Sequence, residues 1–295
     1  MGTRLRSPFG SAAHARPDPP SDTERYRGGS GTPLLLLHGI SATWRVWKPV
    51  LPLLVAHHDV IAPTLLGHSG APPLGAGVEP SLAALVDGVE ADLDRLRLDT
   101  VHVAGNSMGG WIALELARRG RANSVVVFAP AGAWPSDKRF AVVVAGLTLA
   151  DRVLASHGPL LERLAGTRLG RRMLVRPHFE HPERADPAEV IADLRAARNS
   201  PVVRPLLKVI MKTPLRPLSD PGCPVRVVWP GRDRLIPYER YASPMMARLP
   251  GAELVRLDGV GHVPMIDDPD AVTRLILEVT ASVDGRQVHV RGGAT

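Results

Sequence analysis

Residues 101–120, VHVAGNSMGGWIALELARRG, place an apolar strand-like run directly against an amphipathic helical pattern. One serine and three glycines occupy the junction, so no residues remain for a connecting loop. A strand that turns at once into a helix forces the residue between them into a strained backbone conformation, and flanking glycines remove the Cβ atoms that would collide there. The junction therefore restricts the chain to folds in which a buried strand leads straight into a helix.

Strand-length apolar runs alternate with helix-length amphipathic segments on both sides of this junction. The runs are apolar nearly throughout, which indicates strands buried on both faces of a sheet. They read PLLLLH, DVIAPTLL, TVHVAG and SVVVFAP, and the pattern resumes later with PVRVVWP and ELVRLDG. This alternation predicts an α/β fold with a mostly parallel central sheet flanked by helices.

A long, mainly helical segment interrupts the alternation after the sequence APAG. We therefore expect residues 31–132 and 221–283 to form the core, and residues 133–220 to form an inserted helical cap. Residues 1–30 are rich in Pro, Arg, Gly and Ser, which predicts a flexible leader with at most a short strand near Tyr26. Residues 284–295 are expected to form a tail.

The charge of the chain bears on its partners. Lys and Arg number 36 and Asp and Glu 29, giving a formal net charge of +7. A positive charge suits nucleic acid or an anionic membrane surface. Almost all of it is arginine, spread along the chain and interleaved with acids. We therefore expect a small-molecule substrate and no nucleic-acid partner.

The apolar runs and the cysteine content bear on the compartment. Residues 1–30 hold no signal-like apolar run, and Cys223 is the single cysteine, which together favour a cytoplasmic protein. The longest apolar run, residues 140–150, is shorter than the roughly 20 residues needed to cross a bilayer. We expect no membrane span, and a monomer or homodimer.

Ser107 lies at the centre of GNSMG, which fits the pattern G-x-S-x-G. Such a short pattern recurs by chance, but here a strand ends at Gly105 and a helix begins at about Met108, which would raise the hydroxyl above the sheet. The helix N-terminus would lie beneath it and favour developing negative charge. No G-x-G-x-x-G or G-K-[ST] loop is present, which argues against a nucleotide-binding turn. Ser69, in GHSGA, precedes two prolines and is expected to be a loop residue.

A serine nucleophile needs a base within hydrogen-bond reach and a group that orients the base. Among 11 histidines, His262 in GVGHVP follows the last strand, at the carboxyl edge where open parallel sheets bind ligands. Asp233, in GRDRLIP, leaves another strand at the same edge and is predicted to orient the base. Asp258, Asp267 and Asp268 are alternatives, although the last two are expected to cap the final helix.

The sequence LHGI supplies a second backbone donor at this edge. We expect the N–H groups of Ile40 and Met108 to form an oxyanion hole, and His38 to shape the loop as a structural residue. His178 and His181, in PHFEH, lack a third ligand pattern. We therefore expect neither a metal nor another cofactor.

A substrate pocket is expected between the sheet and the cap. Its candidate lining residues, near the predicted edge loops or beside the histidine, are Trp44, Trp111, Trp134 and Val263. With the apolar run at residues 140–149 they favour a largely apolar substrate, although packing of cap on core would explain the same residues equally well.

These motifs together resemble the α/β-hydrolase superfamily with a helical cap, over about residues 31–282. HGI resembles the family's oxyanion strand end, GNSMGG its nucleophile elbow, GRDRLIP its acid loop and GVGHVP its histidine loop. The resemblance implies an α/β-hydrolase fold with Ser107, Asp233 and His262 as a catalytic triad. Serine at the elbow argues against the epoxide-hydrolase and haloalkane-dehalogenase branches, which carry an aspartate there.

Hydrolysis of a carboxylic ester through an acyl-enzyme is the activity that we expect. Hydrolysis of a carbon–carbon bond in a vinylogous diketone is the nearest alternative, because GNSMGG and Trp44 also occur in that branch. That branch usually carries tryptophan after the catalytic histidine, where this chain has Val263. Thioester or lactone hydrolysis would use the same residues, and a non-catalytic small-molecule receptor on this fold is a further alternative.

Overall fold

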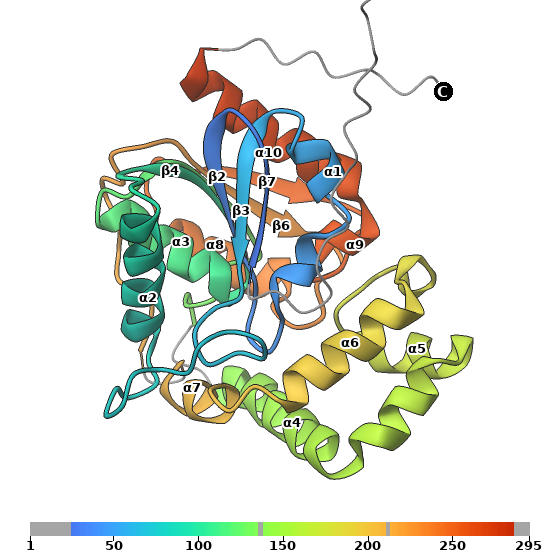
Figure 1. Cartoon of the computed structure of the whole chain (residues 1–295). Helices are drawn as coiled ribbons and strands as arrows, with labels where there is room; N and C mark the ends of the chain where they lie inside the picture. The colour runs from blue at the N-terminus through green and yellow to red at the C-terminus, as the bar shows by residue number, and fades with distance from the viewer. Residues whose placement is uncertain (1–24, 135–137, 211–212, 286–295) are drawn as a thin grey trace, which may run out of the picture.

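The computed structural model describes residues 25–134, 138–210 and 213–285. Within these residues a seven-stranded sheet forms the centre, in the order β1-β3-β2-β4-β5-β6-β7 (Figure 1). The strands are β1 (Arg25–Gly29), β2 (Thr32–Leu37), β3 (His58–Pro63), β4 (Val101–Asn106), β5 (Ala122–Phe128), β6 (Val225–Pro230) and β7 (Glu253–Leu257). Only β1 pairs antiparallel, with β3, so the predicted mostly parallel sheet is confirmed.

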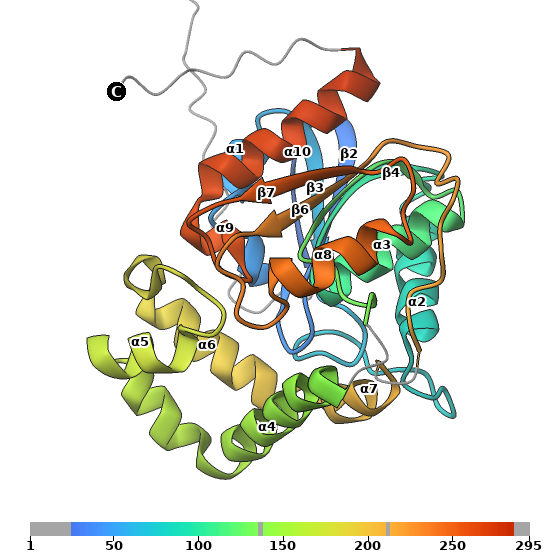
Figure 2. The ribbon, with the colours of Figure 1, turned by 180° about the vertical axis from the view of Figure 1, so that it is seen from behind.

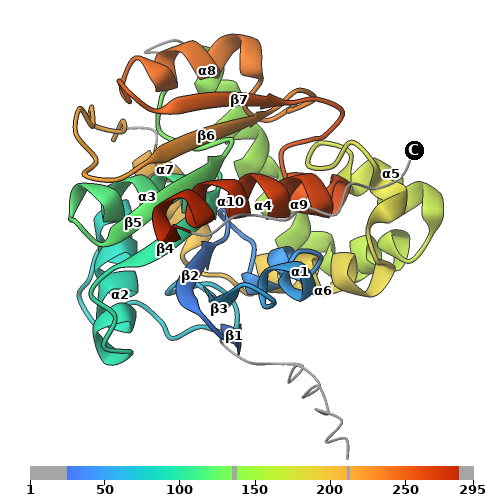
Figure 3. The same cartoon turned by 90° about the horizontal axis from the view of Figure 1, so that it is seen from above.

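Helices cover both faces of the sheet, with α2, α3 and α8 along one face and α1 and α10 along the other (Figure 3). The core helices are η1 (Trp44–Trp47), α1 (Leu51–Leu54), α2 (Leu82–Arg95), α3 (Met108–Arg118), α8 (Tyr238–Met246), α9 (Pro264–Asp267) and α10 (Pro269–Asp284). In β2, Leu35 and Leu37 pack with the first layer of helices, and Leu34 and Leu36 with the second. Successive side chains of a strand point to opposite faces, which explains the unbroken apolar run.

A helical cap lies beyond one end of the sheet (Figures 1 and 2). Its elements are α4 (Lys138–Ala165), α5 (Arg168–Val175), η2 (Pro182–Arg184), α6 (Pro187–Arg198) and α7 (Val203–Ile210). They lie within residues 133–220, the segment predicted as an insertion. The backbone of α4 leaves helical geometry at His157, with φ −126° and ψ 19°, two residues before Pro159. Proline inside a helix removes a backbone hydrogen bond and bends the chain.

One cap helix has the length and composition of a membrane span, namely Ala141–Ala165 within α4. The sequence prediction of no span considered only the uninterrupted run at residues 140–150, whereas the apolar character continues beyond it. Only 17% of the most apolar stretch of this helix is buried, and Val142 and Leu149 are exposed. The helix packs against α6 in the cap, so the cap carries an apolar outer surface.

The sheet begins earlier than the predicted start of the core at residue 31. Strand β1 lies within the predicted leader, where Tyr26 pairs with Ala62 of β3. At the other end, Asp284 belongs to α10, and its Oδ2 accepts a hydrogen bond of 2.7 Å from the hydroxyl of Thr32. The rest of the predicted leader and tail, residues 1–24 and 286–295, lies outside the described residues.

Candidate active site

Ser107 occupies the sharp turn between β4 and α3. Its φ of 56° and ψ of −115° lie in a region that side-chain-bearing residues rarely adopt. A Cβ atom on Gly109 would overlap the backbone oxygen of Leu37, and one on Gly105 would overlap the backbone oxygen of Gly109. The glycines let the helix start against the sheet, and the strain falls on the serine.

His262 and Asp233 form a buried hydrogen-bonded pair. The Nδ1 atom of His262 lies 2.7 Å from Oδ2 of Asp233. The other carboxylate oxygen, Oδ1, accepts the backbone N–H groups of Leu235 at 2.8 Å and Ile236 at 2.7 Å. Because the carboxylate is held on both sides, it keeps the proton on Nδ1 and leaves Nε2 of the imidazole free to accept one.

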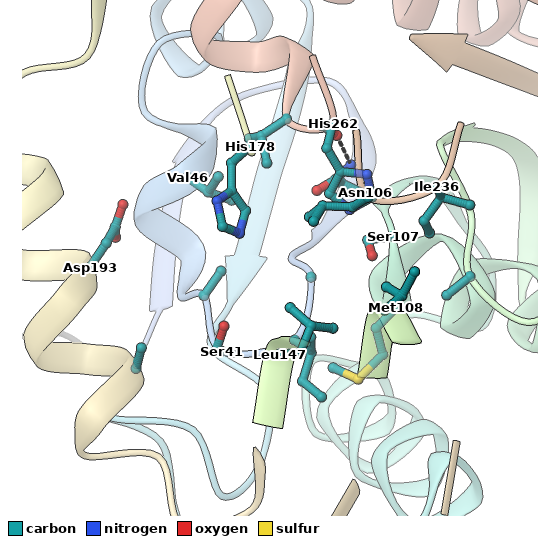
Figure 4. Close-up of a pocket in the computed structure, with 18 of the residues that line it drawn as sticks. Ser41, Val46, Asn106, Ser107, Met108, Leu147, His178, Asp193, Ile236 and His262 are labelled. Atoms are coloured by element: carbon teal, nitrogen blue, oxygen red, sulfur yellow. Dashed lines mark hydrogen bonds between the residues drawn. The ribbon is translucent and has the colours of Figure 1, made fainter. Parts of the chain in front are cut away.

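A hydrogen bond ties the serine turn to the histidine loop. The side-chain amide of Asn106 donates to the backbone oxygen of His262 at 2.9 Å (Figure 4). It also donates to the backbone oxygen of Phe128 at 3.1 Å. Ser107 and His262 line the same cavity. In the described part of the chain the two side chains are not hydrogen-bonded to each other, and such contacts commonly tighten only when a substrate binds. The sequence prediction did not single out Asn106, which is the first variable position of G-x-S-x-G.

The HGI loop lies directly against the serine. A Cβ atom on Gly39 would stand 3.3 Å from the Cβ of Ser107. Ile40 and Met108 both line the cavity. Met108 opens α3, and the first N–H groups of a helix have no partner within it. Both residues that the sequence analysis predicts as backbone donors thus lie at the cavity that Ser107 lines.

The cavity has a volume of about 220 Å³ and lies between these loops and the cap. Trp134 and Val263 line it, whereas the other two tryptophans predicted for the pocket do not. Trp111 is 1% exposed and belongs to the core beneath the sheet. Trp44 stacks on Tyr26, with ring centroids 5.7 Å apart, at the first edge of the sheet. Both were placed correctly near edge loops, but their side chains turn into the core.

The sequence matches the family described as Alpha/beta hydrolase family over residues 34–275. The chain belongs to the alpha/beta hydrolase family. Its relatives include the epoxide hydrolase EphH of Mycobacterium tuberculosis, 37% identical over 217 residues, which are 72% of this chain and 99% of the relative. They also include a 2-hydroxy-6-oxo-2,4-heptadienoate hydrolase of Pseudomonas putida, 35% identical over 101 residues, 33% of this chain and 36% of the relative.

A solved structure confirms the fold of this alpha/beta hydrolase. A thermophilic esterase from Thermogutta terrifontis superposes with a TM-score of 0.67 at 24% identity, covering 88% of this chain and 93% of the esterase. At that identity the likeness concerns the fold.

His38 fixes the direction of the Gly39–Ile40 peptide in this hydrolase. Nε2 of His38 accepts the backbone N–H of Leu65 at 2.9 Å, so the proton sits on Nδ1, which donates to the Gly39 oxygen at 2.7 Å. In a trans peptide the C=O and N–H point in opposite directions. The Ile40 N–H is therefore turned away from the His38 ring, as a backbone donor to the cavity would require. Burial lowers the pKa of His38 to about 3, so the ring is neutral.

Replacing His38 by alanine should lower kcat about 10²-fold, the usual cost of losing one oxyanion donor, with little change in KM. The reason is that the Gly39 carbonyl loses its shorter hydrogen bond and keeps only the one from the backbone N–H of Ala42 at 3.3 Å, so the peptide can rotate more freely. Steady-state kinetics on a hydrolysed ester measures the effect. His157→Ala, an exposed histidine of the cap, is the control and should match the wild type. A folded His38→Ala protein with wild-type kcat would contradict this role.

The sequence analysis expected Asp267 to cap the final helix, and this prediction is wrong. Asp267 instead joins the histidine loop to the helical cap. Its Oδ2 accepts the backbone N–H groups of Gly261 at 2.7 Å and Glu180 at 2.9 Å, and its Oδ1 accepts that of His181 at 2.7 Å. Asp268 alone caps α10. The buried Asp267 carboxylate thus fixes the loop that carries the catalytic candidate histidine.

Asp267→Ala should lower the free energy of unfolding by about 3 kcal/mol or more, because three backbone N–H groups lose a charged acceptor that is itself fully buried. Asp268→Ala removes a helix cap and should cost about 1 kcal/mol. Urea unfolding of the two variants beside the wild type compares them directly. Equal losses would show that Asp267 contributes no more than a helix cap.

Two polar side chains of the cap, His178 and Asp193, also line the cavity (Figure 4). The sequence considered His178 only together with His181, and the structure separates them. The ring of His181 contacts the carboxylate of Glu183 and the backbone oxygen of Gly259. Burial, and then the nearby His262, lower the pKa of His178 to about 4. Among the residues with described positions, no group of three His, Cys, Asp or Glu is placed to hold a metal ion.

A second Ser–His–Asp arrangement lies at the opposite end of the strands. Nδ1 of His102 is 2.8 Å from the hydroxyl of Ser124, and its Nε2 is 3.1 Å from Oδ1 of Asp284. Ser124 and His102 are 0% exposed, and neither lines the cavity. This cluster ties α10 to the sheet. A site for chemistry also needs a concave pocket, which selects Ser107.

Proposed function

We propose that this alpha/beta hydrolase is a serine hydrolase that cleaves a carboxylic ester of a small, largely apolar molecule. One observation carries the proposal, namely that the candidate nucleophile, the candidate base and the residues of both candidate backbone donors line one cavity. These are Ser107, His262 with its partner Asp233, Ile40 and Met108.

In the first half of the proposed reaction, Nε2 of His262 takes the hydroxyl proton of Ser107 as the Ser107 oxygen attacks the ester carbonyl. The backbone N–H groups of Ile40 and Met108 stabilise the resulting oxyanion. The intermediate collapses, the C–O bond to the alcohol breaks, and His262 donates its proton to the leaving oxygen. The product is an acyl ester on Ser107.

In the second half, His262 takes a proton from water, and the hydroxyl oxygen attacks the acyl carbonyl. The bond to Ser107 breaks, and the serine oxygen recovers the proton from His262. Asp233 stays ionised throughout and stabilises the imidazolium through the 2.7 Å hydrogen bond.

The chemistry of serine argues against epoxide hydrolysis, the activity in the name of the relative EphH. Attack of the Ser107 oxygen on an epoxide carbon would form an ether, which has no carbonyl for water to attack. The enzyme would be alkylated and would not turn over. An ester leaves an acyl group that water can remove, so the residue at the elbow favours an ester.

The size and lining of the cavity bear on the substrate. A volume of about 220 Å³ is below the roughly 300–1,000 Å³ typical of pockets for drug-sized ligands. Most of the lining side chains are apolar, with Val143, Leu147 and Ile210 from the cap among them. A short-chain or single-ring ester fits this description.

Carbon–carbon bond hydrolysis of a vinylogous diketone is the second candidate. It is favoured by the relative named as a 2-hydroxy-6-oxo-2,4-heptadienoate hydrolase. The same histidine and serine would serve, because that reaction also passes through addition to a carbonyl beside the scissile bond.

Initial rates on three substrate classes distinguish these functions. The panel is p-nitrophenyl acetate to hexanoate, styrene oxide, and 2-hydroxy-6-oxo-2,4-heptadienoate, each with Ser107→Ala as the blank. We expect turnover of at least one ester and none of the epoxide. Turnover confined to the dienoate would replace ester hydrolysis by the second candidate, and epoxide turnover would overturn the serine-based scheme.

A further inference from the structure

Asp193 is a carboxyl group in the wall of an otherwise largely apolar cavity. It lies on α6 and lines both the main cavity and a second cavity that shares part of its wall. Its Oδ1 atom is buried and has no hydrogen-bond partner among the described residues. Its neighbours on the same helix wall are Val190, Leu194 and Ala197, all apolar.

A buried carboxyl oxygen without a partner is unfavourable, because it has lost the hydrogen bonds that water would supply. More than nine in ten buried polar groups in native proteins have a partner. An aliphatic residue at position 193 would continue the wall made by Val190 and Leu194 without this penalty. We therefore expect a molecule that enters the cavity to supply the hydrogen-bond donor that Asp193 lacks.

The nearest charged groups do not supply that partner. Glu189 accepts hydrogen bonds from Arg45 at 2.9 Å and from Lys48 at 2.6 Å, so both cations are directed to Glu189. Burial, and then the negative charge of Glu189, raise the pKa of Asp193 to about 7, while Arg45 and Lys48 oppose the rise. At neutral pH the group is therefore present both as acid and as carboxylate. In either form it can accept a hydrogen bond.

The position of Asp193 relative to Ser107 defines the shape of a suitable molecule. Figure 4 shows the two residues on opposite sides of the cavity, Asp193 on the cap and Ser107 on the core. Apolar side chains such as Val46 and Leu147 lie between them along the lining, together with the ring of His178. A ligand spanning this distance would have a reactive carbonyl at one end, an apolar middle and a hydrogen-bond donor at the other end.

We infer that Asp193 is a specificity-determining residue that binds a hydroxyl group of the substrate, at the end remote from the scissile ester. This inference rests on the proposed function, since the Ser107 end defines where the ester reacts. A hydroxyl suits the site better than an ammonium group, because a hydroxyl forms a hydrogen bond with either the acid or the carboxylate form of Asp193, whereas an ammonium group pairs well only with the carboxylate.

The test compares esters that differ only in one terminal group. p-Nitrophenyl 6-hydroxyhexanoate, 7-hydroxyheptanoate and 8-hydroxyoctanoate, whose chains are too long for rapid lactone formation, are each paired with the ester that carries methyl in place of the hydroxyl. For the best-fitting length, wild-type kcat/KM should favour the hydroxyl ester at least tenfold, the effect of a hydrogen bond to a charged group. Asp193→Leu should lose this preference, and Asp193→Asn should keep part of it.

Three further readouts keep the inference open to refutation. Asp193→Leu should raise the Tm of the unliganded protein, since a buried carboxyl oxygen without a hydrogen-bond partner is removed, whereas a structural role would lower it. Asp99→Leu, at an exposed position outside the helical cap, is the control and should leave the preference for the hydroxyl ester unchanged. The third readout is kcat/KM for p-nitrophenyl 6-aminohexanoate. A higher value than for both the 6-hydroxyhexanoate and its methyl-terminated counterpart would overturn the hydroxyl assignment.

Calorimetric titration of the same ester pairs into Ser107→Ala separates this inference from the proposed function. Tighter binding of the hydroxyl ester, without turnover by the wild type, would support the Asp193 site and refute ester hydrolysis. Turnover with no preference for the hydroxyl ester in rate or binding, at all three lengths, would refute the Asp193 site and leave ester hydrolysis standing.

Discussion

Replacing Ser107 by alanine is expected to reduce kcat for ester hydrolysis by on the order of 10⁶-fold. The variant lacks the oxygen that forms the acyl-enzyme, so His262 and Asp233 have no nucleophile to activate. Catalysis above the rate in water, by roughly 10³ to 10⁴, should persist because the backbone donors and the cavity remain. Stopped assays with high enzyme concentration on a p-nitrophenyl ester measure this residual rate.

The matched control is Ser69→Ala, which alters the serine of GHSGA. That serine lies in a loop outside the cavity lining, where its backbone N–H is bonded to the hydroxyl of Ser200. Its variant should show wild-type kinetics. If Ser107→Ala retained more than a few per cent of wild-type kcat, the proposed nucleophile would be wrong.

Asp233→Asn is expected to lower kcat by about 10⁴-fold with a small change in KM. The asparagine oxygen can still accept the N–H groups of Leu235 and Ile236, so the loop is kept. Its amide N–H₂ then faces Nδ1 of His262, where it donates and drives the imidazole proton to Nε2. An Nε2 atom that carries a proton cannot accept the one from Ser107.

Asp258→Asn tests the assignment against a rival acid of the sequence. Asp258 is exposed and its carboxylate is bonded to Arg256 at 2.9 Å. Its variant should keep wild-type rates. The rates are measured from pH 6 to 9, so that an altered protonation of His262 would appear as a changed pH profile. A larger loss from Asp258→Asn than from Asp233→Asn would reverse the assignment of the orienting acid.

The sheet and the positions around it were predictable because burial on both faces leaves a pattern in the sequence. The run PLLLLH is apolar since Leu34 and Leu35 face different helical layers. Ser107, Asp233 and His262 each follow a strand that ends at the same edge of the sheet, so their convergence follows from topology. The strain at Ser107 was also predictable, because glycine spacing marks where the chain must turn sharply.

Features that depend on side-chain direction or on the cap were not predictable in this way. Trp44 and Trp111 lie near edge loops, but their side chains point into the core and not into the cavity. From the sequence, Asp267 is expected to be a helix N-cap because it precedes a helix. Only the folded helical insertion brings the backbone of Glu180 and His181 against it. Asp193 carries no local signal at all, since its role depends on which face of α6 meets the cavity.

Covalent labelling tests the central claim, a nucleophilic serine at the strand-to-helix turn, most directly. The protein is treated with a fluorophosphonate, digested with trypsin and analysed by mass spectrometry. The account predicts a single stoichiometric adduct in the peptide spanning residues 98–118, located on Ser107 and absent from Ser107→Ala. An adduct on another residue, or none while the untreated protein hydrolyses esters, would contradict it.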